Sequence, residues 1–326
     1  MAFLTGAGTS VSAGIPDFRS PGGLYDTLRP DLITATREQR AAMETDPTTV
    51  VSWSMFSQNQ FPYLEVRRPF ILGIAEKQWK PTATHFFMRI CEDKGKLRRV
   101  FTQNIDGLDY QTGISAAKVV SVHGSMGQIA CEGCAASMDS NAFKTAVRTS
   151  IKDIYGVDDD NAPRESKEIP CEQCGRPLVK PNTVLYGRSL PPSFFSAVEE
   201  DFPAGGGLVN ILFVAGTSLT VQPASSVPDY ATASFRVVVD LHPVGGNMFD
   251  FSDEKSEKRD MFLQGKCDEV FVDLAAECGW LDELASFAQE MSDSSRVLIE
   301  RKLEERPRGR EGSAFSSSGG GGGGGI

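Results

Sequence analysis

Short runs of β-branched and other apolar residues recur along the chain, and each ends in glycine or polar residues. They lie within residues 100–104, 119–125, 211–219 and 236–240, and a further apolar run at residues 2–4 precedes Gly6. Runs of this length and composition predict strands buried on both faces of a parallel sheet. Ligands of such sheets bind beyond the carboxyl ends of the strands, so we expect the polar endings to converge on one crevice. The pattern predicts an α/β fold built on a Rossmann-like parallel sheet.

A glycine-rich turn follows the first of these strands. It occupies residues 6–20 and reads Gly-Ala-Gly-Thr-Ser-Val-Ser-Ala-Gly-Ile-Pro-Asp-Phe-Arg-Ser. Small residues let backbone N–H groups approach nucleotide phosphates, and a helix starting here would add its positive end. Val11 stands where the usual dinucleotide motif has its third glycine, so the Gly-x-Gly alone fits an ordinary strand-to-helix turn as well. An ordinary turn has no need of the Asp-Phe-Arg at residues 17–19.

This turn and three later motifs resemble the sirtuins, the NAD-dependent protein deacylases, in their class I form. The later motifs are Thr-Gln-Asn-Ile-Asp at residues 102–106, His-Gly-Ser at 123–125 and Gly-Thr-Ser-Leu at 216–219, in the order found in the family. The resemblance covers roughly residues 2–290. It implies a protein lysine deacetylase or deacylase that consumes NAD and releases nicotinamide and 2′-O-acyl-ADP-ribose.

The resemblance also implies roles for individual residues. His123 would be the catalytic base that accepts a proton from the NAD ribose, and Asn104 and Asp106 would hold the nicotinamide amide and the ribose. The residues expected to bind NAD are Ala7, Gly8, Thr9, Ser10, Val11, Asp17, Phe18, Arg19, Gln103, Asn104, Ile105, Asp106, Gly216, Thr217, Ser218, Asp240, Leu241, His242 and Cys267.

The chain has three histidines, which narrows the choice of a base. An imidazole titrates near neutrality and is a natural acceptor for a hydroxyl proton. His123 ends a buried strand and precedes a glycine that leaves its ring uncovered, with a packed core histidine as the alternative. His85 follows Thr82 and Thr84, either of which can cap a helix, so we expect it to be packed. His242 lies just past the run at residues 236–240 and could only line the part of the site that holds the nucleotide.

Four of the seven cysteines form two Cys-x-x-Cys pairs, Cys131 with Cys134 and Cys171 with Cys174. Each pair can direct two thiolates at one metal, and two pairs complete a tetrahedral zinc site that leaves no position for water and is therefore structural. Thioredoxin-like redox chemistry is the alternative for a single pair. The other three cysteines are expected to be packed: Cys91, Cys267 and Cys278. Cys267 also matches a turn that touches adenine in the sirtuin family.

The composition is that of a globular protein large enough for two domains, with 326 residues and 40% hydrophobic content. A formal net charge of −10 argues against a nucleic-acid-binding surface and favours basic partners such as histone tails; solubility alone is the alternative. The sequence contains neither an apolar run of about 18 residues nor a signal peptide at its start. We therefore expect a nuclear or cytoplasmic protein that does not bind membranes.

We expect two domains and a tail. Residues 1–126 and 208–291 would form the Rossmann-like NAD-binding catalytic domain, and residues 127–207 an inserted small zinc-binding domain that includes the substrate groove. An amphipathic helix is expected over residues 280–291. Residues 292–326 are polar and end in a run of glycines, a composition that cannot bury enough apolar surface to offset chain entropy, so they are predicted to be disordered.

Three departures from the family pattern concern the substrates. The β-prone segment 179–191 is expected to accept the substrate peptide as an added strand, but it carries Arg188 where class I members have glutamate. Asp240 replaces an asparagine at the adenosine end, and no basic pair follows Gly22-Gly23, which favours acetyl or longer apolar acyl groups over acidic ones.

The alternatives to a protein deacylase are protein mono-ADP-ribosyl transfer, a catalytically weak NAD-binding scaffold and, more remotely, a dehydrogenase.

Overall fold

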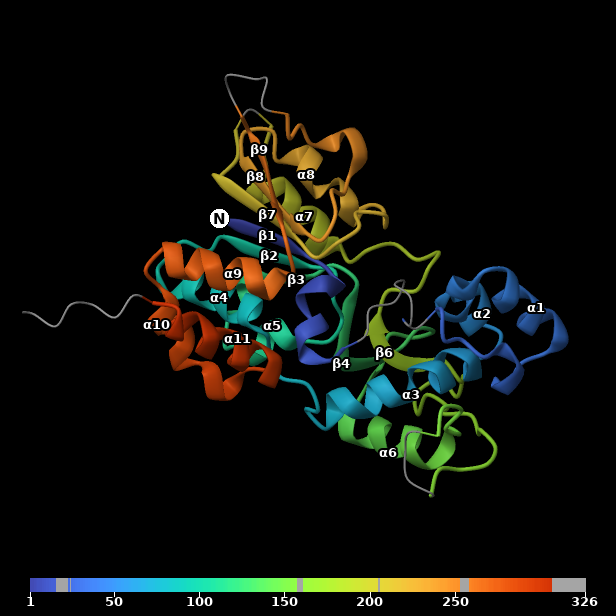
Figure 1. Ribbon diagram of the computed structural model, residues 1–326. Coiled ribbons are helices and arrows are strands. Elements are labelled where there is room, and N and C mark those ends of the chain that lie inside the picture. The colour runs from blue at the N-terminus through green and yellow to red at the C-terminus, as the bar shows by residue number, and fades with distance from the viewer. Residues whose placement is uncertain (16–22, 24, 157–160, 205, 253–257, 307–326) are drawn as a thin grey trace, which may run out of the picture.

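A six-stranded parallel sheet forms the centre of the computed structural model, which describes residues 1–15, 23, 25–156, 161–204, 206–252 and 258–306. The strand order is β3-β2-β1-β7-β8-β9, and every neighbouring pair is parallel (Figure 1). The chain leaves β1 for β2 on one side and later returns to β7 on the other, so a crevice is expected beyond the carboxyl end of β1. The strands are β1 (Ala2–Thr5), β2 (Arg99–Thr102), β3 (Val119–Ser121), β7 (Ile211–Ala215), β8 (Phe235–Asp240) and β9 (Asp260–Gln264).

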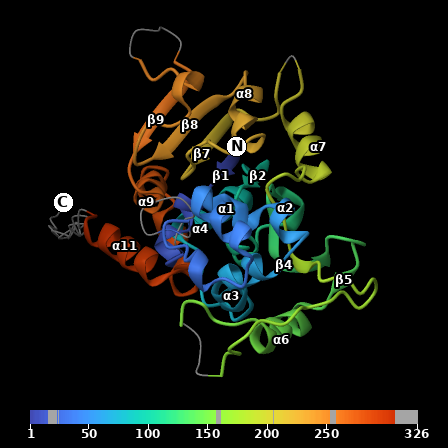
Figure 2. The same ribbon diagram turned by 90° about the vertical axis from the view of Figure 1, so that its right-hand side faces the viewer.

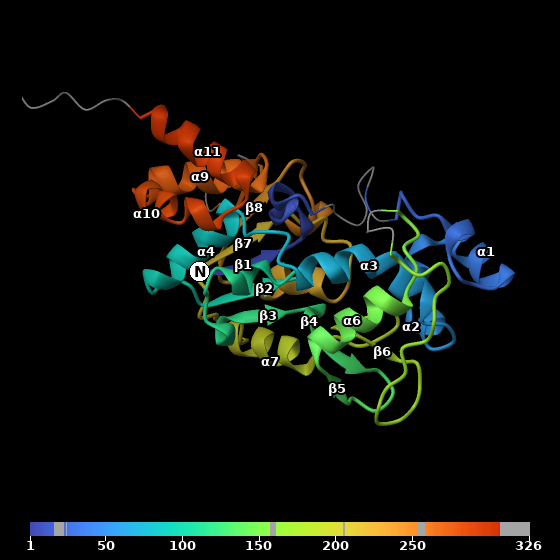
Figure 3. The same cartoon turned by 90° about the horizontal axis from the view of Figure 1, so that it is seen from below.

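Helices cover both faces of this sheet, because successive side chains of each strand point to opposite faces. Phe3 and Phe213 pack toward one helical layer, with ring centroids 4.9 Å apart, while Leu4 packs toward the other. The two layers lie on opposite sides of the sheet in Figure 3. The first contains α4 (Ala83–Asp93), α9 (Cys267–Glu277), α10 (Leu281–Ser286) and α11 (Asp293–Glu304), and the second α7 (Pro192–Asp201) and α8 (Val227–Tyr230).

A second module, called the small module below, holds a three-stranded antiparallel sheet in the order β5-β4-β6. Helix α3 packs against α6, and both contribute side chains to the core beneath this sheet. The module lies to one side of the parallel sheet, with its helices near the viewer in Figure 2. Its elements are α1 (Arg37–Thr45), α2 (Trp53–Phe56), α3 (Phe61–Ala75), β4 (Gly124–Cys131), β5 (Ser137–Met138), α6 (Ser140–Ser150) and β6 (Val179–Thr183).

The packing differs from the expected division into residues 1–126 with 208–291 and residues 127–207. Ile33 and Leu64, from the first of these ranges, share one core with Phe143 of α6. Helix α7, expected in the small domain, instead packs on the parallel sheet through Phe194. The pattern of a helix shows that it has an apolar face but not which distant segment covers it, so the boundaries could not be read from the chain order.

The predicted disorder from residue 292 onward is wrong for the first part of that segment. Helix α11 begins after Ser292, whose hydroxyl accepts a hydrogen bond from the Ser295 N–H. Ser295 is fully buried and donates to Asp268 of α9, and Ile299 packs into the core. Because the buried polar groups satisfy one another, a few apolar side chains are enough to hold this helix. Residues 307–326 lie outside the described residues.

The expected helix at 280–291 is shorter than predicted: α10 ends at Ser286, and a 3₁₀ turn follows.

Among the described residues, no helix combines the length and the apolar character needed to cross a membrane. The remaining short helices are α5 (Leu108–Gln111) and the 3₁₀ turns Ala7–Thr9, Val11–Ala13, Pro30–Leu32, Pro47–Val51, Ala116–Lys118, Ala224–Ser226, Gly246–Met248 and Ala288–Glu290.

Candidate active site and four-cysteine cluster

A cavity of about 750 Å³ lies at the carboxyl ends of the parallel strands. The turns that follow β1, β2, β7 and β8 contribute to its wall, as does the start of α9. The expected convergence of the polar strand endings on one crevice is thereby confirmed. The cavity is lined by these expected site residues: Ala7, Gly8, Val11, Gln103, Asn104, Ile105, His123, Gly216, Thr217, Ser218, Asp240, Leu241, His242 and Cys267.

Three expected site residues do not line the cavity. Thr9, Ser10 and Asp106 lie behind its wall, all of them buried. Their expected contact with the cofactor stays a prediction. Asp17, Phe18 and Arg19 fall outside the described residues, so their expected closure over the cofactor stays a prediction.

The glycine-rich turn is held against the turn that follows β7. The Gly8 N–H donates to the Gly216 carbonyl at 2.9 Å, and a Cβ on Gly8 would lie 2.6 Å from Gly216 Cα. This contact between two loops requires glycine whether or not a phosphate is bound. The helix expected at this point is absent from residues 6–15, which form two 3₁₀ turns ended by Gly14 in the left-handed region at φ 84°.

The Asn104 side chain is fixed by three acceptors. Its Nδ2 lies 3.0 Å from the Gly6 carbonyl and 3.1 Å from the hydroxyls of Thr9 and Ser10. Its relative exposure is 8%, so little of the amide reaches the cavity. The interactions join the end of β2 to the glycine-rich turn and orient the amide group before any ligand arrives.

Asp106 belongs to a buried cluster behind this amide. Its carboxylate accepts a hydrogen bond from Ser10 Oγ at 2.7 Å, and one ligand atom each from Asp106, Asp109 and His85 lies within 4.8 Å of the others. Burial raises the pKa of Asp106, although His85 opposes the shift, and burial raises the pKa of Asp109 to about 6. His85 is fully buried, as expected, with Nδ1 accepting from the Thr82 N–H at 3.2 Å. No pattern in the sequence indicated that Asp109 belongs to this cluster.

His123 has the geometry of a general base. Its Nδ1 lies 2.9 Å from the Gln103 carbonyl, and because a carbonyl oxygen can only accept, Nδ1 carries the proton. Nε2 is then left with a lone pair, and it is buried without a hydrogen-bond partner among the described residues. Burial lowers the pKa of the imidazole, an effect that the Gln103 hydrogen bond only partly opposes. The ring is therefore neutral and able to accept a proton at pH 7.

Helix α3 brings two further residues to the cavity that the sequence analysis did not select. Tyr63 and Arg67 stand one helical turn apart and both line the wall. The Tyr63 hydroxyl lies 2.9 Å from Thr183 Oγ1 on β6, and Arg67 is only 6% exposed. The i, i+4 spacing places them on one face of the helix, but only the packing of α3 shows that this face meets the cavity.

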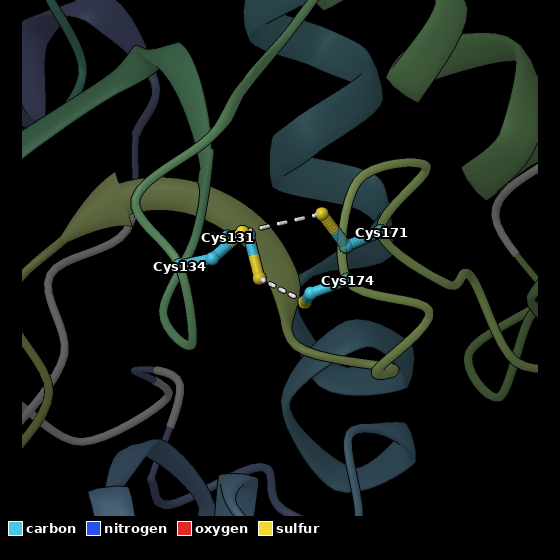
Figure 4. Close-up of side chains that lie close together, drawn as sticks. All are labelled: Cys131, Cys134, Cys171 and Cys174. Atoms are coloured by element: carbon cyan, nitrogen blue, oxygen red, sulfur yellow. Dashed lines mark hydrogen bonds between the residues drawn. The ribbon is translucent and has the colours of Figure 1, made fainter.

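The four cysteines form a single cluster in the small module (Figure 4). All four Sγ atoms lie within 4.8 Å of one another, with 3.7 Å between Cys131 and Cys174 and 3.7 Å between Cys134 and Cys171. A tetrahedral zinc with Zn–S bonds of about 2.3 Å separates its sulfurs by about 3.8 Å. The thiols fit such a site, and the meeting of both Cys-x-x-Cys pairs in one cluster favours a metal over a thioredoxin-like motif.

The chain is similar in sequence to proteins named as NAD-dependent deacetylases. The chain is 32% identical to NAD-dependent protein deacetylase sirtuin-2 of Danio rerio, over 92% of this chain and 72% of that protein. Identity is 30% with NAD-dependent protein deacetylase hst2 of Schizosaccharomyces pombe, over 86% and 72%, and 34% with NAD-dependent deacetylase sir2A of Dictyostelium discoideum, over 86% and 49%. The chain thus spans about half the length of the Dictyostelium protein.

Fold and family comparisons point the same way. A solved structure described as "Structural Basis for the Mechanism and Regulation of Sir2 Enzymes" matches with a TM-score of 0.61 and 27% identity, over 86% of this chain and 92% of that one. The family model described as Sir2 family matches residues 6–223. This chain belongs to the Sir2 family, the sirtuins.

Proposed function

We propose that this protein removes acetyl groups from lysine side chains of other proteins in an NAD-dependent reaction. The observation that supports this most directly is His123, which lines the cavity at the carboxyl ends of the strands and whose Nε2 has no hydrogen-bond partner among the described residues. Relatives covering most of the chain are named as NAD-dependent protein deacetylases. NAD supplies an activated ribose carbon from which nicotinamide departs, and the acyl group leaves as 2′-O-acyl-ADP-ribose.

The lining residues suit the parts of the cofactor. The turns at residues 6–11 and 216–218 would meet the phosphates with those N–H groups that do not already donate to backbone carbonyls, as the N–H groups of Gly8 and Gly216 do. Asp240 would accept from a hydroxyl of the adenosine ribose. Asn104 would orient the nicotinamide end, with Asp106 acting as a positioning residue through Ser10. After nicotinamide has departed, His123 would take the ribose hydroxyl proton at Nε2.

The substrate would be a protein segment that carries an acetylated lysine. Residues 179–191 lie beside the base, since the Val184 N–H donates to the His123 carbonyl at 2.8 Å. We expect the peptide to run along this segment as an added strand and its acyl-lysine to enter the cavity. The formal net charge of −10 would favour basic tails, including those of histones, in the nucleus or cytoplasm.

One assay tests the proposed function. The protein is incubated with NAD and an acetyl-lysine peptide, and the products are identified by mass spectrometry. Free lysine peptide, nicotinamide and O-acetyl-ADP-ribose in equal amounts are expected. ADP-ribosylated protein without deacetylation would instead support the transferase, NADH a dehydrogenase, and unconsumed NAD the scaffold. A succinyl-lysine peptide is included because Arg67 lines the cavity; faster turnover of that peptide would contradict the expected preference for uncharged acyl groups.

The acid side of the pH–rate profile should report His123. The base works when neutral, and burial lowers its pKa from the ordinary value of 6.5, so the acid limb of kcat should have its midpoint below pH 6.5. The profile is measured in parallel for Asp109→Asn, which removes a buried carboxyl group whose pKa is raised to about 6. An acid limb centred above pH 7, or one that disappears in Asp109→Asn, would contradict the assignment to His123.

A further inference from the structure

The segment that carries Arg188 is fixed to the helical part of the small module. The Trp53 N–H donates to the Tyr186 carbonyl at 2.9 Å, and the Tyr186 N–H donates to the Val51 carbonyl at 3.1 Å. Arg188, two residues further on, lines the cavity and keeps 41% of its side chain exposed. The arginine therefore stands at the mouth of the cavity rather than on a loose surface loop.

Two side chains hold the Arg188 guanidinium in place. Its centre lies 4.0 Å from the centroid of the Trp53 ring, a cation–π stack, and its Nη2 lies 3.2 Å from Glu132 Oε2. The interaction with Glu132 uses one of the five N–H donors, and the described residues accept no hydrogen bond from the other four. A planar donor fork in fixed orientation is suited to bind a carboxylate with two hydrogen bonds.

Glu132 does not neutralise this arginine, because it also serves a second cation. Lys180 is 1% exposed, and its Nζ lies 2.8 Å from Glu132 Oε1. In the described part of the chain, the cluster of Lys180, Glu132 and Arg188 holds two positive charges and one negative charge. Glu132 is thus shared between two cations, so its single charge does not fully offset the Arg188 guanidinium, which lines the cavity.

We infer that Arg188 selects acetyl-lysine segments that carry an aspartate or glutamate close to the modified lysine. This inference rests on the proposed deacetylase function and narrows its substrate class away from basic tails. A substrate lysine that reaches His123 must enter past the cavity mouth, so a neighbouring side chain of the peptide meets the guanidinium there. A carboxylate would pair with its unused N–H groups, whereas lysine or arginine would be repelled at short range.

The test compares kcat/KM for three acetyl-lysine peptides that differ only in the residue next to the acetyl-lysine: glutamate, glutamine or lysine. For the wild type we expect the glutamate peptide to exceed the lysine peptide by about threefold to tenfold, with the ratio falling as salt is added. Arg188→Gln should bring the ratio close to one, and Arg188→Glu should reverse it. Trp53→Ala keeps the charge but releases the guanidinium, so it should lower the ratio partway.

The matched control is Arg37→Gln, which makes the same charge change on exposed α1, away from the cavity lining. It should leave the ratio unchanged. Turnover of the glutamine peptide by the wild type reports the deacetylase activity itself, so its absence would overturn the proposed function. If that peptide is turned over but wild type and Arg188→Gln rank the three peptides identically, only the inference about Arg188 is overturned.

Discussion

His123→Ala is expected to lower kcat at least about a hundredfold, a loss of about 2.7 kcal/mol of transition-state stabilisation, while the protein stays folded. The reason is that the His123 ring lines the cavity and its Nε2, unprotonated and without a hydrogen-bond partner in the described chain, is the atom proposed to take the ribose proton. Release of deacetylated peptide measures the effect, and the thermal unfolding midpoint confirms folding.

His242→Ala provides the matched control, since His242 lines the same cavity from the turn after β8. That variant should act mainly on the KM for NAD and leave kcat within a few-fold. Because His123 is proposed to act after nicotinamide departs, His123→Ala should still exchange labelled nicotinamide into NAD. Deacetylation by His123→Ala within a few-fold of the wild type would remove His123 from the mechanism.

Removal of zinc is expected to unfold the small module and so abolish activity. The four cysteines should hold one zinc per chain, and a structural zinc contributes about 10–16 kcal/mol of binding free energy that a folded module this small cannot forgo. Cys131 and Cys171 belong to the same core as residues of α3 and α6, so loss of the metal exposes that core. Elemental analysis and hydrogen exchange before and after chelation measure the effect.

Cys131→Ala should reproduce the effect of the chelator, whereas Cys278→Ala, an exposed cysteine at the end of α9, should keep the zinc and the activity. Protection should be lost in α6 and β6 and largely kept in the parallel sheet. Protein purified without chelator that contains no zinc, or a small module that stays protected after chelation, would contradict a structural metal.

The sheet and the cysteine cluster were accessible from the sequence for a local reason. Buried parallel strands are short, continuous apolar runs, and the polar residues that end them necessarily reach the same edge, so residues such as Gln103, His123 and Thr217 could be placed together. Two Cys-x-x-Cys pairs carry their own geometry within four residues each, so only the meeting of the two pairs depended on the fold.

Other features depended on packing between distant segments. Asp106 was expected to hold the nicotinamide amide and the ribose, and only the fold shows that it belongs to a buried cluster with His85 of α4. Helix α11 forms from a polar sequence since Ser295 finds a buried carboxylate on α9. A composition argument counts apolar residues and cannot see such a partner.

What the sequence determined by itself is therefore five of the six parallel strands, the chemistry at their carboxyl ends and the members of the four-cysteine cluster, all of which follow from patterns within a few residues. The edge strand β9 was not predicted. The tertiary structure alone decided which helices share the small-module core, that Tyr63 and Arg67 reach the cavity, and that Arg188 is stacked on Trp53 beside Glu132. These contacts join residues dozens of positions apart, and their free energy depends on packing that no local pattern encodes.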